Sequence, residues 1–147
     1  MTIYLACTVR GDRGGVAAMR EVADLLDRHG HIVLTRHLLA DDVDRAESEL
    51  TERDVFERDL RWLDGADLLI AEASGSSYGV GFEVGYVLGR ASQTGQRVLV
   101  LYQADRRSQV SRLIAGNAHP CCTTYPYRDG QDLLRFVDVF LAPVPGR

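Results

Sequence analysis

The segment Asp67-Leu68-Leu69-Ile70-Ala71-Glu72-Ala73, followed by Ser74-Gly75-Ser76-Ser77-Tyr78-Gly79, decides the fold of this chain. Its first part is a short apolar run, which predicts a buried β-strand. Its second part is a loop of small residues, and the apolar stretch after it predicts a helix that runs to about Arg90. A buried strand that leads through a short loop into a helix is the repeating unit of parallel α/β folds.

The same unit recurs on both sides of this segment. Apolar runs predict strands at residues 3–7, 31–35 and 97–102, and a weaker strand at residues 122–125. Helical spacing predicts helices at residues 16–28, 51–63, 110–114 and 129–141. Because the strand runs are continuous rather than alternating, we expect a Rossmann-like (flavodoxin-like) α/β fold: a mostly parallel five-stranded sheet with helices on both faces. One domain covers residues 1–142, and we expect residues 143–147 to form a frayed tail.

Two of the predicted helices carry apolar residues that we expect to be buried. The helix at residues 51–63 has an apolar stripe formed by Val55, Phe56, Leu60 and Leu63. The helix that follows Gly79 has so little polar surface that we expect it to be buried all round.

Composition and charge restrict the classes of function. The 147 residues are 46% hydrophobic and 26% charged, with a formal net charge of −4 and no dense block of Lys and Arg. That pattern argues against binding of a nucleic-acid polymer, whereas one phosphorylated small molecule needs only a few placed groups. The N-terminus lacks the pattern of a signal peptide, and no apolar run approaches the ~20 residues of a membrane span.

The cysteines predict neither disulfides nor a metal centre. Cys7, Cys121 and Cys122 are odd in number and lack metal-ligand spacing, as expected of reduced thiols in a cytoplasmic protein. The acidic stretch after Ala40 lacks the glycine and terminal glutamate of a calcium loop. We therefore expect no metal and no cofactor.

Glu83 is the only carboxylate between Ala73 and Gly89. Burial of an ionised carboxylate without partners is costly, so such a group is either paired or functional. Asp59 lies at the edge of the apolar stripe of the preceding helix. Cleavage of a glycosidic bond requires two carboxylates at one crevice, one beside the sugar and one to move protons. A structural glutamate and a solvated aspartate remain the alternative interpretation.

The loops at the ends of the strands predict an anion site. Thr8, Arg10 and Gly11 follow the first strand, and Ser74, Ser76 and Ser77 precede the helix after Gly79. Hydroxyls, free amides at a helix N-terminus and one Arg can together hold a phosphate. The alternative is that these residues are ordinary turns and helix caps. The glycine spacing of a dinucleotide fingerprint and a Walker loop are both missing.

Four stretches of the chain resemble the nucleoside 2-deoxyribosyltransferase superfamily. They are Ile3-Tyr4-Leu5-Ala6-Cys7-Thr8-Val9-Arg10-Gly11, Glu57-Arg58-Asp59-Leu60-Arg61-Trp62-Leu63, Ala66-Asp67 and Ser77-Tyr78-Gly79-Val80-Gly81-Phe82-Glu83-Val84-Gly85. Within the superfamily, the chain is most similar to the 2'-deoxynucleoside 5'-phosphate N-hydrolases. The similarity runs from Ile3 to about Gly116, with the stretches in the same order and with closely similar spacing.

The resemblance implies roles for three catalytic residues. Glu83 matches the nucleophile, which attacks the anomeric carbon to form a covalent glycosyl-enzyme that water then opens. Asp59 matches the carboxylate that assists proton transfer at the leaving base. Tyr4 matches a tyrosine near the sugar and the nucleophile, and a tyrosine at this position favours deoxyribose.

The resemblance also implies a set of substrate-binding residues and a homodimer. Thr8, Arg10, Ser77 and the amide of Gly79 match the 5'-phosphate site, beside Gly11. Val9 and His37 lie near the base pocket, although His37 can equally be an ordinary loop histidine. Ser111 matches a phosphate-contacting serine that the neighbouring subunit donates.

The chain departs from the pattern of the hydrolases at three places. Thr8 stands where serine is usual, and Cys7 stands where glycine is common and narrows the pocket. The segment at residues 103–109 is longer than in similar hydrolases, which weakens the match of Ser111.

We therefore expect the chain to hydrolyse the N-glycosidic bond of a (2'-deoxy)nucleoside 5'-monophosphate, giving the free base and 2-deoxyribose 5-phosphate. One alternative is base exchange, in which a second nucleobase intercepts the same intermediate; Asn117 keeps that alternative open. The other is a nucleotide-binding domain without turnover. The identity of the base, purine or pyrimidine, does not follow from the sequence.

Overall fold

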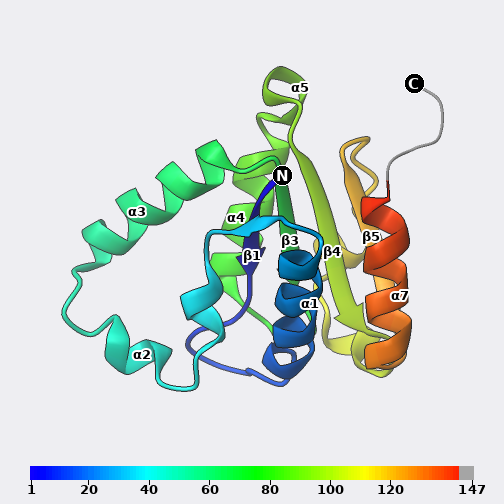
Figure 1. Ribbon diagram of the computed structural model, residues 1–147, viewed down its shortest axis with the longest axis horizontal. Coiled ribbons are helices and arrows are strands. Elements are labelled where there is room, and N and C mark those ends of the chain that lie inside the picture. The colour runs from blue at the N-terminus through cyan, green and yellow to red at the C-terminus, as the bar shows by residue number, and fades with distance from the viewer. Residues whose placement is uncertain (143–147) are drawn as a thin grey trace.

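Five strands form one sheet in which every neighbouring pair is parallel, as the computed structural model of residues 1–142 shows (Figure 1). The strands are β1 (Thr2–Ala6), β2 (Ile32–Val33), β3 (Leu68–Glu72), β4 (Arg97–Gln103) and β5 (Cys122–Tyr127), and their order is β2-β1-β3-β4-β5. This order confirms the predicted flavodoxin-like α/β fold. The tail predicted at residues 143–147 lies outside the described residues.

Helices cover both faces of the sheet. The face of α1 (Val16–Arg28) and α7 (Gly130–Leu141) also receives the short η1 (Arg36–Leu39), and the opposite face holds α4 (Tyr78–Leu88). The short α5 (Ala91–Thr94) lies beyond the end of the sheet at which β4 begins (Figure 1). Side chains alternate along each strand, so Ile3 and Leu5 pack in the first layer while Tyr4 packs in the second. The remaining elements are α2 (Val43–Ala46), α3 (Glu52–Gly65), η2 (Ala104–Gln109) and α6 (Arg112–Ala115).

Strand β2 is shorter than the strand predicted at residues 31–35. The hydroxyl of Thr35 accepts a hydrogen bond from the amide of Leu5 over 2.8 Å and donates to the carbonyl of Leu5 over 2.7 Å. The buried Thr35 side chain therefore pairs with the amide and carbonyl of Leu5, to which the backbone of a longer β2 would have bonded.

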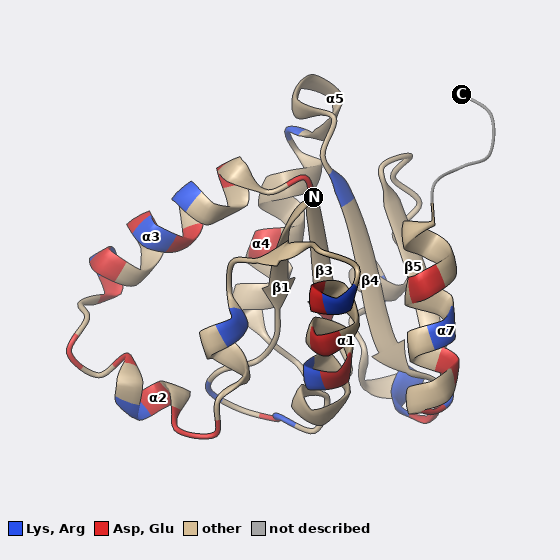
Figure 2. Ribbon diagram, viewed as in Figure 1, with Lys and Arg blue, Asp and Glu red and all other residues tan. Residues whose placement is uncertain are grey.

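Helix α3 extends away from the sheet toward α2 (Figure 1), and acidic and basic residues are interspersed along it (Figure 2). Thr51 and Asp54 form a capping box at its start. The predicted buried stripe is wrong for three of its four members: Leu63 is buried, but Val55 and Leu60 are only half-buried and Phe56 is 52% exposed. Because most of α3 lies beyond the edge of the sheet, its apolar residues have little to pack against.

Helix α4 is not buried all round, which corrects the second expectation for the helices. Val80, Val84 and Val87 pack against the sheet, but Tyr78 and Phe82 are exposed. The chain therefore presents aromatic side chains on the outer surface of the helix that carries Glu83.

The carboxyl ends of β1 and β3 meet where the strand order reverses. After β1 the chain forms β2 on one side of β1, and it later forms β3 on the other side of β1. In open parallel sheets, the loops at this reversal leave a crevice in which ligands bind. Among residues 1–142, no helix is both long and apolar enough to cross a membrane.

Candidate active site

Tyr4 and Glu83 come together at this reversal. Tyr4 lies in the middle of β1 and is fully buried, and Glu83 projects from the second turn of α4, the helix that follows β3. The Tyr4 hydroxyl donates a hydrogen bond to Oε1 of Glu83 over 2.6 Å. The predicted catalytic glutamate and tyrosine are therefore direct partners, although 79 residues separate them in the sequence.

Burial controls the protonation of this pair. Desolvation raises the pKa of Glu83 to about 7, the negative charge of Asp59 adds to the rise, and the hydrogen bond from Tyr4 opposes it. Burial and the charge of Glu83 raise the pKa of Tyr4 far above its usual value, so the phenol stays protonated. Near neutral pH the carboxyl group of Glu83 is poised between its two protonation states.

A cavity of about 540 Å³ opens over Glu83, a size that suits a small ligand. Among the residues predicted for the site, Asp59, Val9, Arg10, Ser77 and Gly79 line it together with Glu83. Tyr4 lies beneath it as the partner of Glu83. Ser76, which was predicted for the anion site, lines it too, and the lining also includes residues that were not predicted from the sequence: Leu38, Glu47, Leu50, Glu52, Val55, Tyr78 and Val80.

One end of the cavity carries the groups suited to an anion. Ser77 is the N-cap of α4 and accepts a hydrogen bond from the amide of Val80 over 3.3 Å, and Gly79, in the first turn of the helix, lines the cavity beside it. Arg10 lines the cavity but is highly exposed, and its Nε lies 2.9 Å from Asp44. Thr8 and Gly11 do not line the cavity; Thr8 is buried, and Gly11 turns the loop with a φ of 134° that favours glycine.

Two of the lining carboxylates, Glu47 and Asp59, share one arginine as their partner. Nε of Arg58 donates to Oδ1 of Asp59 over 2.8 Å, and its Nη2 donates to Oε1 of Glu47 over 2.6 Å. His37, which does not line the cavity, has its Nε2 3.3 Å from Oε1 of Glu47, and its ring packs edge-on against Trp62 at 5.4 Å. Glu47 was missed because the irregular acidic stretch that precedes α3 has no periodicity to show which side chain points inward, and Arg58, which lies in α3, could not be assigned to the site without this partner.

Cys7 lines the cavity next to Leu38. Its thiol lies 3.8 Å from the carbonyl oxygen of Leu38. Burial raises the pKa of Cys7 to about 11, so the group stays a thiol rather than a nucleophilic thiolate.

A second buried carboxylate, Glu72, was also missed. It lies at the end of β3 on the α1 side, where it accepts hydrogen bonds from the amide and hydroxyl of Ser74 and from the hydroxyl of Tyr127. Burial raises its pKa. The hydroxyl of Ser74 also accepts from the amide of Gln103, so Glu72 ties together three strand-end segments. The available signal was that Glu72 is the only acidic residue inside the apolar run at residues 68–73.

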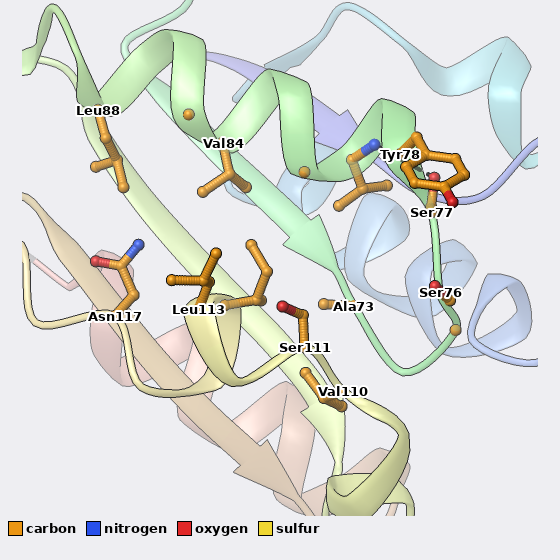
Figure 3. A pocket seen from close by; sticks show the side chains of 15 residues that line it. Ala73, Ser76, Ser77, Tyr78, Val84, Leu88, Val110, Ser111, Leu113 and Asn117 are labelled. Atoms are coloured by element: carbon orange, nitrogen blue, oxygen red, sulfur yellow. Dashed lines mark hydrogen bonds between the residues drawn. The ribbon is translucent and has the colours of Figure 1, made fainter.

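Ser111 lies outside the cavity over Glu83. It is exposed and lines a separate groove of about 590 Å³ between α4 and the segment around α6 (Figure 3). Val84 and Leu88 face Leu113 and Asn117 across this groove. The two cavities meet at the start of α4, where Ser76, Ser77, Tyr78 and Val80 line both. Within residues 1–142, no cluster of three potential metal ligands occurs.

Comparisons with known proteins confirm the resemblance to this family that the sequence indicated. The family model for nucleoside 2-deoxyribosyltransferase matches residues 3–121. A protein from Thermofilum pendens with the provisional name 2'-deoxynucleoside 5'-phosphate N-hydrolase 1 is 40% identical over 96% of this chain and 95% of its own length. The 5-hydroxymethyl-dUMP N-hydrolase of Danio rerio is 31% identical over 89% of this chain and 90% of its own length.

Two solved structures share the fold. The CMP N-glycosidase BcmB of Clostridium botulinum superposes with a TM-score of 0.71 at 16% identity, over 96% of this chain and 100% of that one. A 2-deoxyribosyltransferase from Bacillus psychrosaccharolyticus superposes with a TM-score of 0.56 at 20% identity, over 91% of this chain and 90% of that one. At these identities, the likeness concerns the fold alone.

Proposed function

The chain belongs to the nucleoside 2-deoxyribosyltransferase family, and from that premise we propose that it hydrolyses the N-glycosidic bond of a 2'-deoxynucleoside 5'-monophosphate. It is an N-glycosidase, in line with the names of its relatives. The observation that carries the proposal is the hydrogen-bonded pair of Tyr4 and Glu83 beneath a cavity that Asp59 also lines. Binding alone does not require a poised carboxylate next to a second one.

In the first step, the Glu83 carboxylate attacks the anomeric carbon while the bond to the base breaks. The electron pair of that bond leaves with the base, and Asp59 in its protonated form delivers the proton that the base takes up. In the second step, water adds to the anomeric carbon, its proton passes to Asp59, and Glu83 is released. The products are the free base and 2-deoxyribose 5-phosphate.

The phosphate belongs at the end of the cavity that holds Arg10, Ser77 and the amide of Gly79. The N-terminus of α4 and the guanidinium supply the favourable charge there, and the carboxylates Glu47 and Glu52 line the rest of the wall. Thr8 and Gly11 shape the same loop.

The active unit is a homodimer. Tyr78 and Leu113 are exposed by 101% and 86% and flank the groove in which Ser111 lies, while Phe82 adds apolar surface on α4. Exposed apolar surface of this kind is typical of an interface. Ser111 does not line the cavity of its own chain. When a second copy docks at this groove, Ser111 therefore contacts the phosphate in the partner's cavity.

The test is an assay of purified protein with deoxyribonucleoside and ribonucleoside 5'-monophosphates and the matching nucleosides, each with and without a second base. Release of base from monophosphates alone, unaffected by the second base, is the expected result. Asn117, which lines the same groove as Ser111, keeps base exchange as the second candidate. Capture of the added base into a new nucleoside would establish base exchange instead. Binding without base release from any substrate contradicts both.

A further inference from the structure

We propose that Arg58 is a positioning residue that directs proton transfer to one oxygen of Asp59, and that Glu47 acts through Arg58. This inference rests on the proposed function, because it assigns Asp59 its role at the leaving base. Arg58 bridges the two carboxylates: its Nε donates to Oδ1 of Asp59 and its Nη2 to Oε1 of Glu47.

The guanidinium of Arg58 is fixed in one orientation. Its central carbon stacks 4.8 Å from the centre of the Trp62 ring, one turn further along α3. His37 contacts both Trp62 and Glu47, so the stack and the ion pair share a second support. The planar fork of Arg loses little further freedom when it bonds two carboxylates at once.

The cluster is partly shielded from water. The side chains of Arg58, Glu47 and Asp59 are 16%, 14% and 20% exposed. Ion pairs at this depth are screened less than surface pairs, such as that between Arg10 and Asp44. This cluster of Glu47, Arg58 and Asp59, here called the clamp, therefore holds its geometry while a ligand enters the cavity.

The consequence for Asp59 concerns its two oxygens. Oδ1 is engaged as an acceptor from Arg58, whereas Oδ2 has no hydrogen-bond partner within residues 1–142. A carboxyl oxygen that already accepts from a guanidinium is a poor place for a proton. Proton exchange with the leaving base therefore takes place through Oδ2, while the hydrogen bond from Arg58 keeps Oδ1 turned toward the guanidinium.

The clamp also connects the acidic segment to the chemistry. Glu47 follows α2 and is 11 residues from Arg58. Removal of its carboxylate frees one arm of the guanidinium and leaves the hydrogen bond to Asp59 without support. Glu47→Gln is thus expected to reproduce part of the loss caused by a change at Arg58.

The kinetic test compares Arg58→Met with two other variants. We expect kcat to fall on the order of 10- to 100-fold with a much smaller change in KM, because misplacement of a reacting group by a fraction of an ångström has such effects. Arg58→Lys should recover part of kcat, since one ammonium cannot serve both carboxylates. Arg61→Ala, a change at an exposed residue on the same helix, should leave kcat unchanged.

A double-mutant cycle separates positioning from general damage. If Arg58 acts through Asp59, Arg58→Met costs nothing further in kcat when it is added to Asp59→Ala. A cost in that background equal to the cost in the wild type overturns the proposal. The pH profile of kcat should also change shape in Arg58→Met, whereas a variant that is only destabilised keeps the profile of the wild type.

A second readout does not depend on turnover. In 15N-labelled protein, the Nε–H resonance of Arg58, assigned by its loss in Arg58→Met, should exchange with water more slowly than that of Arg61. Asp59→Ala should abolish the difference. Equal, fast exchange for both residues overturns the clamp. A wild type that releases no base from any monophosphate overturns the proposed function instead, and the exchange measurement still decides whether the clamp exists.

Discussion

The hydroxyl of Tyr4 donates to Oε1 of Glu83 over 2.6 Å. This bond joins the middle of β1 to the second turn of α4 at the place where the strand order reverses. Desolvation alone raises the pKa of a buried carboxyl group, and an O–H donor lowers it again by stabilising the ionised form. Tyr4 therefore sets how much of Glu83 is ionised at a given pH, and with it how much of the enzyme is competent for attack.

Tyr4→Phe should shift the pH dependence of the reaction. With the pKa of Glu83 at about 7, kcat/KM falls as the pH drops below that value. Loss of the hydrogen bond raises the pKa further, so the acidic limb of kcat/KM moves to higher pH. Tyr86→Phe, on the helix that carries Glu83, is the control, because the hydroxyl of Tyr86 binds Asp64 outside the cavity. An acidic limb that stays in place, or moves to lower pH, contradicts this role of Tyr4.

Glu83→Gln should remove turnover while stabilising the fold at alkaline pH. Loss of the nucleophile is expected to lower kcat by at least about 10³-fold, or about 4 kcal/mol of barrier. The pKa of Glu83 rises from 4.5 to about 7 on folding, so the wild type loses stability as the pH rises through that interval. The variant should gain up to about 3 kcal/mol in the free energy of unfolding at pH values near 8, and almost nothing near 4. Urea unfolding at both pH values measures this, and a variant less stable than the wild type at the higher pH refutes it.

The covalent intermediate can be sought directly in the same pair of proteins. Wild-type enzyme quenched in acid during turnover should carry the added mass of a deoxyribosyl phosphate, on the peptide that contains Glu83. Glu83→Gln should show no added mass. An unmodified wild type during steady turnover of an active preparation would favour direct attack by water, with Glu83 as base.

The sequence predicted the parts of the site that depend on one element and missed those that depend on an irregular segment. Glu83 could be found because it is the only carboxylate in an apolar helix, and helix α4 follows a strand whose end lies at the crevice. Glu47 belongs to a stretch without periodicity, so its contact with Arg58 could not be inferred from spacing. Phe56 shows a further limit: a periodic pattern identifies an apolar face but not whether the same chain covers it.

Gly15→Ala should destabilise the protein through Glu72. A Cβ atom at Gly15 would lie 2.1 Å from Cδ of Glu72, whose carboxylate is held by Ser74 and Tyr127. We expect a loss of about 1–3 kcal/mol in the free energy of unfolding, as for other overpacked sites. Gly65→Ala is the matched control: nothing lies within 4 Å of its Cβ, and it should be neutral or stabilising. Equal stability of the two variants would show that Glu72 moves aside freely.

Mixing two impaired proteins should restore activity if Ser111 serves the site of the partner subunit. Ser111→Ala leaves Glu83 intact, and Glu83→Gln leaves Ser111 intact. In a mixed dimer, one site combines both changes, while the other pairs Glu83 of one chain with Ser111 of its partner and is unchanged. Assayed at low substrate concentration, where loss of a phosphate contact weakens turnover most, the activity of the mixture should exceed the sum of the activities of the two separate proteins.

Leu113→Glu, which places a charge on the exposed apolar rim of the groove, should abolish this gain by separating the subunits. Activity that only equals the sum, in a preparation shown by light scattering to contain dimers that exchange subunits, places Ser111 outside the partner's site.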